Sequence, residues 1–521
     1  MSKSSPVPGS NPAGKGGRRL LALVLGCILV FFAGVPFAGW PVQLPRPGVT
    51  LVLWDGPRWA DESGNRYHWV ETKIAEFEAA HPFVEVVLVP TDWGNLRAAL
   101  DSAKEAGRLP DVAPFDLSAG GITPAEIKAG LLEPVDNYIS SPEDISPEAR
   151  AAFTYDGHLW GFPSTMTGQV LLLNLDLFAE RGVSLPADGK WTWDEFRAAC
   201  KKLTFDADGD GKVDHWGFAT YILPGYYEAW PFLYSGGARP LSNDLTTYTF
   251  NSTEGVAALQ RLTDLVFVDK VAHPMTGTAS VRSIFDLFAV KDKQVVAIEP
   301  WSPWAIDYLE TQEGVIKNFA VAEFPTPPGA PPSSSAAPSA ATPAAGGGTS
   351  AATTAVPAAS ASATSTPVTV GGTSGFVVFR QSDPTKRALA MELADYLTNA
   401  KAQYELARGY RAFPSRRRAL DLDPFAGAPV YQKAAEIIFH AVSLPPAADW
   451  PDLDRVIQRE VQMALLGVKS PKAALDDAGA QVTTLLEEAA KKADTAHEGG
   501  ATGSRAAGGT AGPTGAMPGE G

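Results

Sequence analysis

Apolar positions near the start of the folded region follow two different periods, and each period predicts a different element. Val49–Trp54 (VTLVLW) and Val84–Val89 (VEVVLV) are runs of β-branched and apolar residues, which is typical of strands. Between them, Trp69–Ala80 (WVETKIAEFEAA) has apolar residues at helical spacing. Strand, helix and strand in this order predict a right-handed unit with parallel strands, hence an α/β fold. The alternation continues with a helix, an extended segment and a helix at Leu96–Ala106, Asp111–Phe115 and Ala125–Ala129.

A second block of elements begins near Gly161. Gln169–Leu173 (QVLLL) is short and almost continuously apolar, as expected of a buried strand, and Gln294–Ile298 (QVVAI) predicts a strand that ends before Glu299. Two amphipathic helices, each preceded by a residue suited to capping, are expected at Trp193–Lys202 and Thr253–Phe267. A strand and five helices complete the pattern, at Gly375–Phe379, Pro384–Thr398, Ala400–Arg408, Val430–Ala441, Leu453–Leu466 and Pro471–Ala490.

Composition divides the chain further. Its 521 residues are too many for one core and enough for two domains. No charged residue occurs between Glu323 and Arg380, and Pro328–Thr366 consists almost entirely of Ala, Ser, Thr, Pro and Gly. Such a segment cannot bury enough apolar area to offset its ordering entropy, so a disordered insertion is expected at 328–366. A disordered tail is expected at 496–521, where Gly, Ala and Thr dominate.

The first 47 residues predict export. Basic residues up to Arg19 precede an apolar run from Leu20 to Trp40, which is the charge pattern of an export signal or membrane anchor. Three interpretations stay open: lipid attachment at Cys27, an uncleaved single span, or cleavage near Ala38. Each places the folded part outside the cytoplasm, on the outer face of the membrane or secreted. A net charge of −15 argues against a nucleic-acid partner, which needs a basic groove.

Aromatic and acidic residues gather where predicted strands end. Trp301 and Trp304 follow the QVVAI strand together with Glu299, and Trp54 and Asp55 end the first strand. A flat indole offers an apolar face for a sugar ring, and a carboxylate accepts hydrogen bonds from sugar hydroxyls. These residues predict one carbohydrate site assembled from distant segments, although any single tryptophan can equally belong to a core. The other members expected at this site are Asp116, Tyr227 and Trp230.

Several strings in a fixed order resemble the extracellular solute-binding proteins of ATP-driven sugar importers, the maltose-binding-like group. They include LLEPVDNYI (Leu131–Ile139), GHLWGFP (Gly157–Pro163), LNLDLFAERGV (Leu173–Val183), AWPFLYSGG (Ala229–Gly237), AIEPWSPWAI and SPKAALDDA. The resemblance implies a periplasmic-binding-protein-like fold, in which two α/β lobes are joined by a hinge of three crossovers. By segment, lobe 1 would comprise 48–166 and 318–385, and lobe 2 would comprise 167–317 and 386–495. It also implies a monomer that binds sugar between its lobes and delivers it to an ABC permease.

The resemblance extends to individual positions. It places Trp54 and Asp55 at the first strand, Tyr227 and Trp230 in the aromatic stretch, and Trp304 at the family's Gly-Pro-Trp turn, where Ser302 here replaces the Gly. Further positions that the resemblance implies are Asp116 and Ser118 after the third strand and Thr167 at the first crossover. Some family members carry a carboxylate where Thr167 stands, so the family's sugar specificity does not transfer directly. Glu299 and Trp301 have no secure counterpart.

The string DADGDGKVD predicts a calcium loop. Asp206, Asp208 and Asp210 occupy positions one, three and five, and Gly211 permits a sharp turn. The carbonyl of Lys212 and the carboxylate of Asp214 would complete the ligands of a structural Ca²⁺ ion of modest affinity. The twelfth position is Gly217 instead of the usual bidentate Glu. The alternative is a solvated Asp/Gly turn without any ion.

The sequence is also compatible with two other functions. A secreted glycoside hydrolase would also combine aromatic platforms with carboxylates, and Asp55, Asp116 and Glu299 are its nominal acids. A ligand-loaded sensor that docks to a membrane receptor would share the binding fold, so sequence does not separate it from import. Aromatic residues outnumber basic ones among the candidates, which favours a neutral sugar, but Arg58 and Arg411 leave a glycerol-phosphate-like ligand open.

Overall fold

The computed structural model describes residues 48–58, 64–117, 121–327, 369–445, 447 and 450–503, and the side chains up to residue 491. All elements discussed below belong to the unit Val49–Gly521. Several predictions concern parts of the chain outside these ranges and stay predictions: the N-terminal segment with Cys27, the insertion at 328–366, and Ser118. Among the described residues, no helix is both long and apolar enough to cross a bilayer.

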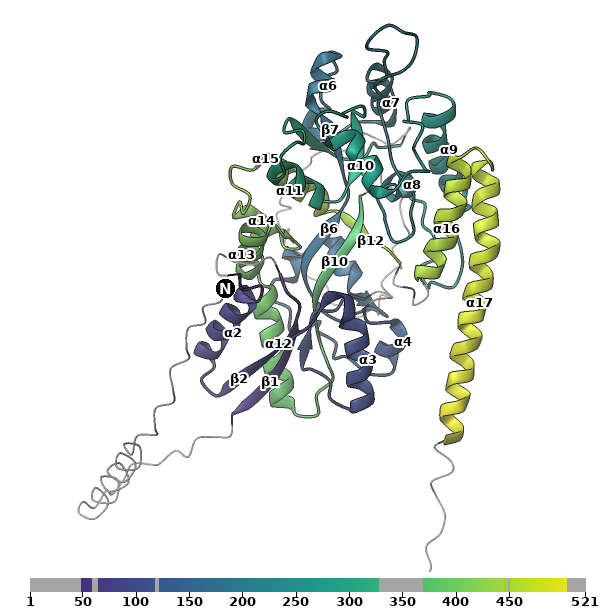
Figure 1. Cartoon of the computed structure of the whole chain (residues 1–521). Helices are drawn as coiled ribbons and strands as arrows, with labels where there is room; N and C mark the ends of the chain where they lie inside the picture. Colours follow the sequence, from purple (N-terminus) through teal and green to yellow (C-terminus); the bar gives the residue numbers. More distant parts are fainter. Residues whose placement is uncertain are drawn as a thin grey trace, which may run out of the picture. The chain divides into compact units, whose positions relative to one another are not determined.

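The first sheet is mixed and follows the order β11-β6-β10-β3-β1-β2, with β12 pairing β10. Its N-terminal strands β1 (Val49–Asp55), β2 (Val84–Pro90) and β3 (Val112–Ala113) are parallel, which confirms the predicted parallel unit. Helices α2 (His68–Ala80), α3 (Leu96–Ala106) and α12 (Pro384–Thr398) lie beside these strands (Figure 1). The remaining strands of this sheet are β6 (Phe162–Gly168), β10 (Thr369–Val378), β11 (Phe413–Pro414) and β12 (Ala441–Ser443).

The second sheet has the order β8-β7-β9, and both neighbours of β7 are antiparallel to it. Side chains of β7 (Val170–Asn174) alternate between two buried faces: Leu171 and Leu173 enter one hydrophobic cluster, and Val170 and Leu172 enter the other. Burial on both faces explains the continuous apolar run in the sequence. The partner strands are β8 (Ile298–Trp301) and β9 (Phe319–Ala322).

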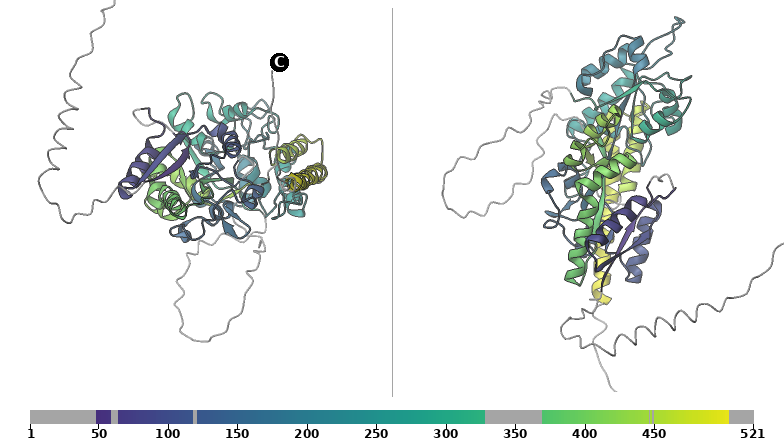
Figure 2. Two further views of the ribbon diagram at one scale, coloured as in Figure 1. Left: turned by 90° about the horizontal axis from the view of Figure 1, so that it is seen from below. Right: turned by 90° about the vertical axis from the view of Figure 1, so that its left-hand side faces the viewer.

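Short helices and turns connect these strands, and a helical pair ends the described chain. Figure 2 shows α16 and α17 running alongside each other. The remaining elements are η1 (Trp93–Asn95), α4 (Pro124–Lys128), η2 (Pro142–Asp144), α5 (Pro147–Ala152), β4 (Thr154–Tyr155), β5 (His158–Leu159), α6 (Leu175–Glu180), η3 (Ala187–Gly189), α7 (Trp193–Lys202), α8 (Trp230–Tyr234), α9 (Thr253–Phe267), α10 (Val281–Ala289), α11 (Trp304–Thr311), α13 (Ala400–Tyr410), α14 (Arg417–Asp421), α15 (Pro429–Ile438), α16 (Trp450–Leu465) and α17 (Pro471–Gly503).

Several predicted element boundaries are wrong. The strand expected from Gly375 begins at Thr369, and the helix expected to end at Ala441 ends at Ile438. The strand expected at Gln294–Ile298 begins only at Ile298 and continues through Trp301, because Ile298–Trp301 is the stretch that pairs with β7. Helix α17 runs to Gly503, so the helix end expected at Ala490 and the disordered tail expected from 496 are placed too early. Helices α3, α7, α9 and α12 have the predicted bounds.

Two lobe boundaries also differ from the prediction. Strand β9 pairs with β7, so residues 319–322 belong with the second sheet and not with lobe 1. Helix α12 contacts β1, β3 and α2, so the segment after 385 begins in lobe 1 and not in lobe 2. Helices α12, α13 and α14 therefore belong to lobe 1, with the first sheet. Helices α16 and α17 pack on α9 and belong to lobe 2, with the second sheet.

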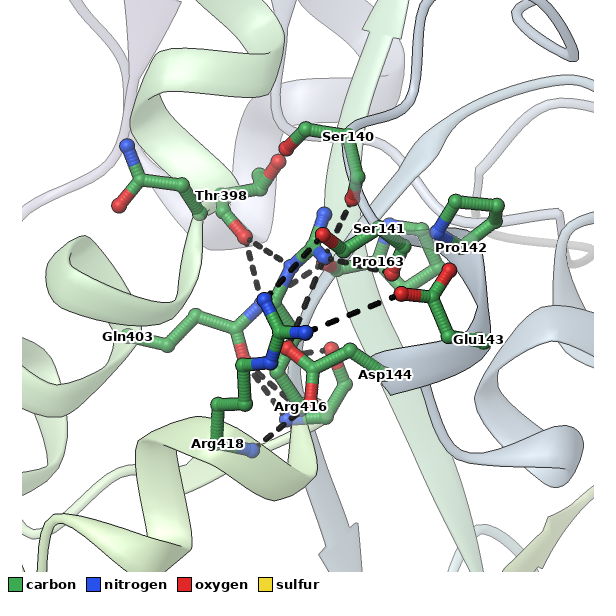
Figure 3. A network of polar contacts seen from close by, with 12 residues as sticks. Ser140, Ser141, Pro142, Glu143, Asp144, Pro163, Thr398, Gln403, Arg416 and Arg418 are labelled. Carbon is green, nitrogen blue, oxygen red and sulfur yellow. Dashed lines mark hydrogen bonds and ion pairs between the residues drawn. The ribbon is translucent and has the colours of Figure 1, made fainter.

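A buried polar network holds the segment α12–α14 to the first sheet (Figure 3). The guanidinium of Arg416 is almost fully buried and donates to the carbonyl oxygens of Thr398 at 2.8 Å and Ser140 at 2.7 Å. The amide of Gln403 donates to the Pro163 carbonyl at 3.1 Å. Because buried donors and acceptors need partners, these bonds fix α13 and the turn before α14 against the loop at 140–144 and the start of β6.

Strand β10 is the long element next to both lobes. Its residues 371–376 pair with β6, residues 377–378 pair with β3, and residues 369–371 pair with β12. Gly371 lies so close to β6 that a Cβ atom would be 1.8 Å from the Thr167 carbonyl oxygen. Only glycine permits this approach, so the strand crossing depends on this residue.

Cys200 of α7 is fully buried, and burial raises the pKa of its thiol. It is the only cysteine within the described residues, and its burial agrees with its predicted role as a small apolar core residue.

Candidate functional site

One cavity brings residues of both lobes together. This central cavity has a volume of about 310 Å³ and is lined by Asp116 after β3, by Tyr227 ahead of α8, by Trp450 at the start of α16 and by 371–373 of β10. Asp116 and Tyr227 were both predicted site residues, and the structure confirms that they share a cavity. Open α/β sheets commonly bind ligands at such strand ends.

The chemistry of the central cavity suits a polyhydroxylated ligand. The indole N–H of Trp450 donates to the Tyr227 hydroxyl at 3.4 Å, which brings two aromatic side chains together on one wall. Burial raises the pKa of Tyr227 to about 12, so its hydroxyl stays neutral. Two lining hydroxyls, those of Thr373 and Ser443, are buried without a hydrogen-bond partner among the described residues. Buried polar groups of this kind are available to a ligand that carries donors and acceptors.

Trp450 was not among the predicted site residues. It lies at the start of a helix, as Trp304 does, but no predicted strand precedes it and the helix was expected only from Leu453. The signal that could have found it is the pair Trp450-Pro451, since Pro is favoured in the first turn of a helix.

A second cavity, of about 340 Å³, lies at the ends of β1 and β2; we call it the lobe 1 cavity. Its lining includes Pro57, Arg58, Trp93, Thr165 and Tyr410. The ring of Trp93 is 48% exposed and its N–H donates to the Pro57 carbonyl at 2.8 Å. Trp93 was not among the predicted site residues, although it closely follows strand β2.

Trp54 and Asp55 do not offer the predicted contacts in this structure. Trp54 is 8% exposed and belongs to the core of lobe 1. Asp55 is fully buried, forms an ion pair with Arg58, and accepts from the Gly56 backbone N–H at 3.0 Å. Burial raises the pKa of Asp55, while Arg58 opposes that rise. Trp54 and Asp55 are consecutive and point to opposite faces of β1, and both are buried because both faces of the strand end are covered; Asp55 therefore orients Arg58 instead of meeting solvent.

Glu299, Trp301 and Trp230 are also interior residues, contrary to the prediction. The fully buried Trp301 indole donates to the Glu299 carboxylate at 2.7 Å, and both residues lie within β8 because that strand extends through Trp301. Burial raises the pKa of Glu299 well above its ordinary value. Trp230 stacks on Phe250 inside the lobe 2 core, with ring centroids 5.7 Å apart. None of these rings has a face free for stacking.

Trp304 and Thr167 remain candidates at the surface. Trp304, the first residue of α11, is 45% exposed and touches Phe285 and Tyr308 with its ring. Thr167 is exposed, and its hydroxyl accepts from the Gly372 backbone N–H at 3.1 Å. Neither residue lines the central cavity or the lobe 1 cavity.

The predicted calcium loop brings its first three acidic side chains together. Carboxylate oxygens of Asp206, Asp208 and Asp210 lie within 4.8 Å of one another. The Lys212 ammonium group contacts Asp210 at 2.9 Å, and Asp214 accepts from the Ala207 backbone N–H at 2.8 Å. Three clustered carboxylates are a donor set of the kind that Ca²⁺ prefers, and the Lys212 ammonium group offsets the charge of Asp210.

The missing twelfth ligand of this loop has a steric cause. A Cβ atom on Gly217 would lie 2.2 Å from the carbonyl oxygen of Cys200. A glutamate therefore does not fit at this position without moving α7.

Comparison with known proteins places the chain in a family. The model of the family "bacterial extracellular solute-binding protein" matches residues 60–404. An uncharacterized lipoprotein of Streptomyces antibioticus is 26% identical over 273 residues, which is 50% of this chain and 55% of that protein. The maltotriose-binding protein of Pyrococcus abyssi is 26% identical over 173 residues, 33% of this chain and 35% of that protein. The chain thus spans about half, or less, of the length of these relatives.

Among solved structures, the sugar-binding protein MalE of Xanthomonas citri aligns with a TM-score of 0.65 at 18% identity, covering 86% of this chain and 99% of that chain. This similarity confirms the predicted two-lobed α/β fold. Because the family model matches well over half of the 521 residues, the chain belongs to the family of bacterial extracellular solute-binding proteins.

Proposed function

We propose that the protein captures a carbohydrate between its lobes, at the central cavity, and delivers it to an ABC-type permease. The observation that carries this proposal is the cavity itself, where Asp116 of one lobe meets Tyr227 and Trp450 of the other. Aromatic rings and hydrogen-bonding side chains are the groups that a neutral sugar requires. The family and the maltotriose-binding relative support the same ligand class.

A thermal-shift screen over neutral mono-, di- and oligosaccharides tests this proposal, with maltotriose as the first probe. A bound sugar stabilises the folded state by mass action, so a sugar near its Kd or above raises the melting temperature. Sugar phosphates serve as the comparison, because Arg58 is already engaged by Asp55 and Arg411 stacks on Tyr431. Isothermal titration of the best sugar should then give a single site. Absence of binding across the neutral panel contradicts the proposal.

The ligand is proposed to be released unaltered. Two of the three carboxyls that a glycosidase could use, Asp55 and Glu299, are fully buried and already hydrogen-bonded. Their burial supports a binding role, since a catalytic acid must reach the glycosidic oxygen. Incubation of the protein with the bound sugar and analysis of the products by chromatography tests this point. Turnover above that of an Asp116→Asn variant would favour a hydrolase.

The site of action is proposed to be the outer face of the cytoplasmic membrane, with the N-terminal segment as the attachment. The family is extracellular, and one relative is named a lipoprotein. Metabolic labelling with a fatty acid distinguishes the routes: label that disappears in Cys27→Ser indicates a lipoprotein, whereas unlabelled membrane-bound protein indicates an uncleaved span. Pull-down of the sugar-loaded protein with permease subunits, or with a receptor instead, separates import from sensing.

The Asp206–Asp214 loop is proposed to bind a structural Ca²⁺ ion. The convergence of three carboxylates within 4.8 Å supports this proposal. The cation would replace the Lys212 ammonium group in compensating the negative charge of the loop.

A further inference from the structure

Helix α16 holds the loop that carries Tyr227. The Asp454 carboxylate accepts from the Gly225 backbone N–H at 2.7 Å and from the Gln458 amide at 2.8 Å. The same Gln458 amide donates to the Tyr226 carbonyl oxygen at 3.0 Å. Asp454 and Gln458 are 1% and 2% exposed, and neither lines the central cavity. The loop is therefore tied to the helix at two successive residues, immediately before Tyr227.

Apart from these bonds, the loop is held by a hydrogen bond from the Tyr226 backbone N–H to the Leu223 carbonyl oxygen at 3.0 Å and by a ring contact between Tyr226 and Tyr221. Leu223 and Tyr226 are more than 40% exposed, and Gly225 has a φ of +83°, a conformation that costs other residues energy. Loops with exposed side chains and few buried contacts open most readily. Tyr227 itself touches α16 through Trp450, whose indole N–H donates to its hydroxyl. The position of one wall of the central cavity thus depends on bonds made by α16.

We infer that Asp454 and Gln458 are positioning residues for carbohydrate binding, which hold the 223–227 loop so that Tyr227 and Trp450 form one wall of the central cavity. This inference rests on the proposed function. A ligand that binds an ordered loop does not have to order it first, so these bonds increase affinity without touching the sugar.

The charge on Asp454 gives this arrangement a pH signature. Burial raises the pKa of Asp454 to about 6, opposed by the hydrogen bonds from Gln458 and Gly225 and by Arg455 on the same helix. The titratable groups that face it from packed elements are the phenols of Tyr227 and Tyr234, which stay neutral because burial raises their pKa values. Protonation turns one acceptor oxygen into a donor and so removes one of the two bonds. Sugar affinity should therefore fall as the pH drops through 6.

The direction in which stability changes with pH distinguishes this effect from general unfolding. A carboxyl whose folded pKa lies above its ordinary value of 3.8 favours the folded state at low pH, and this contribution is lost as the pH rises through 6. Acidification from pH 7.5 to 5 should hence weaken sugar binding while the Asp454 contribution to stability increases. If Asp454 acted only through the stability of the fold, sugar affinity and stability would change in the same direction.

Hydrogen exchange of the loop tests the inference without any ligand. At constant pH, the peptide covering 222–227 should exchange about tenfold faster in Asp454→Ala than in the wild type, the factor expected for a lost bond of about 1.4 kcal/mol. Asp454→Asn keeps one acceptor and should be intermediate. Asp476→Asn, the same change at a partly exposed carboxylate of α17 that bonds to Lys472 and Asn251, is the matched control, and its loop should exchange as in the wild type. If Asp454→Ala fails to fold, Gln458→Leu removes the bond to Tyr226 and takes its place.

Titration with maltotriose, or the best sugar of the screen, supplies the second readout. From pH 7.5 to 5 the wild-type affinity should fall by at most about tenfold, the limit reached when only the ionised form of Asp454, roughly a tenth of the protein one unit below its pKa, binds the sugar. Asp454→Asn should bind more weakly at pH 7.5 and show no such fall, and Asp476→Asn should follow the wild type. Equal affinities and pH profiles in all three proteins, or unchanged loop exchange in both Asp454→Ala and Gln458→Leu, overturn the inference. If the wild type binds no sugar, the proposed function fails, while the exchange result still decides whether α16 holds the loop.

Discussion

Trp301 and Trp304 lie three residues apart, yet their rings have different surroundings. Trp301 is fully buried against Phe285, whereas Trp304 is 45% exposed at the start of α11. Trp304 does not line the central cavity, so Trp304→Ala should weaken sugar binding by about 1–3 kcal/mol only if the ligand extends from that cavity onto its ring; the change in stability should be small. Trp301→Ala should instead cost about 3–5 kcal/mol of unfolding free energy, because it leaves a large cavity. Calorimetric titration and denaturant unfolding of both variants check the pair; unchanged affinity in Trp304→Ala would remove this residue from the site.

Glu299 should make the stability of the fold depend on pH. Its folded pKa lies well above the ordinary value of 4.5 because of burial, so its contribution to stability is present at low pH and is lost as the pH rises above 4.5. Glu299→Gln keeps an acceptor for the Trp301 indole and removes the titration. The stability of the variant relative to the wild type should rise with pH, by at most about 1.4 kcal/mol per unit. Urea unfolding of the variant and the wild type at pH 4.5, 6 and 7.5 checks this. A stability difference that stays constant with pH would contradict the role given to Glu299.

At the residue scale, the sequence could indicate which segments meet at the site but not which side chains face it. Asp116 and Tyr227 were predicted correctly as neighbours of one cavity. Trp54 and Trp301 are buried and not at a cavity, because both faces of β8 and of the end of β1 are covered by other elements, which the local sequence does not reveal. Trp450 does not follow a predicted strand, so the pattern that indicated the other aromatic site residues did not indicate this one.

The Asp206–Asp214 loop is an element whose role a cation titration decides. Millimolar Ca²⁺ should raise the melting temperature by about 1–3 °C, since tenfold excess over Kd contributes about 1.4 kcal/mol. Asp208→Asn removes one of the three clustered carboxylates and should abolish the shift. Asp188→Asn is the control, since it makes the same change in a turn with φ of 51°, a conformation that Asn tolerates. A wild-type melting temperature that does not respond to Ca²⁺ would identify the loop as a solvated turn.

At the element scale, helices were easier to predict than strands. Helices α7 and α9 combine a clear apolar face with N-terminal capping hydroxyls at Thr192 and Ser252, so local chemistry fixes where each helix begins. Strand β8 has no such marker. Its ends follow from pairing with β7, a long-range contact that a run of apolar residues such as QVVAI does not encode.

The connection between the lobes depends on the closeness of β10 and β6. Gly371→Ala should destabilise the fold by about 1–3 kcal/mol, because its methyl group would meet the Thr167 carbonyl oxygen at 1.8 Å. Gly372→Ala is the matched control: the nearest atom to its methyl group is the Thr167 hydroxyl oxygen at 3.7 Å. Urea unfolding of the two variants checks the difference, and equal stability would show that the crossing tolerates more space than the structure provides.

At the scale of the whole molecule, the sequence predicted two lobes but misplaced their boundaries. The segment 386–421 was assigned to lobe 2, yet Gln403 donates to the Pro163 carbonyl of β6 and Arg416 donates to the Ser140 carbonyl, which attaches this segment to lobe 1. Carbonyl partners leave no trace in the sequence, because every residue has one. Tertiary contacts of this kind therefore set the lobe boundaries, whereas local periodicity predicts only the elements.

The burial of Cys200 makes the protein convenient for spectroscopy. Its thiol is enclosed by the core and holds its proton, so maleimide reagents, which attack exposed thiolates, should leave it unmodified. With Cys27 changed to Ser, one cysteine introduced on an exposed helix of each lobe could then carry a donor and an acceptor fluorophore. A change in energy transfer on adding sugar would report directly whether the lobes move together, with no need to replace the native core residue.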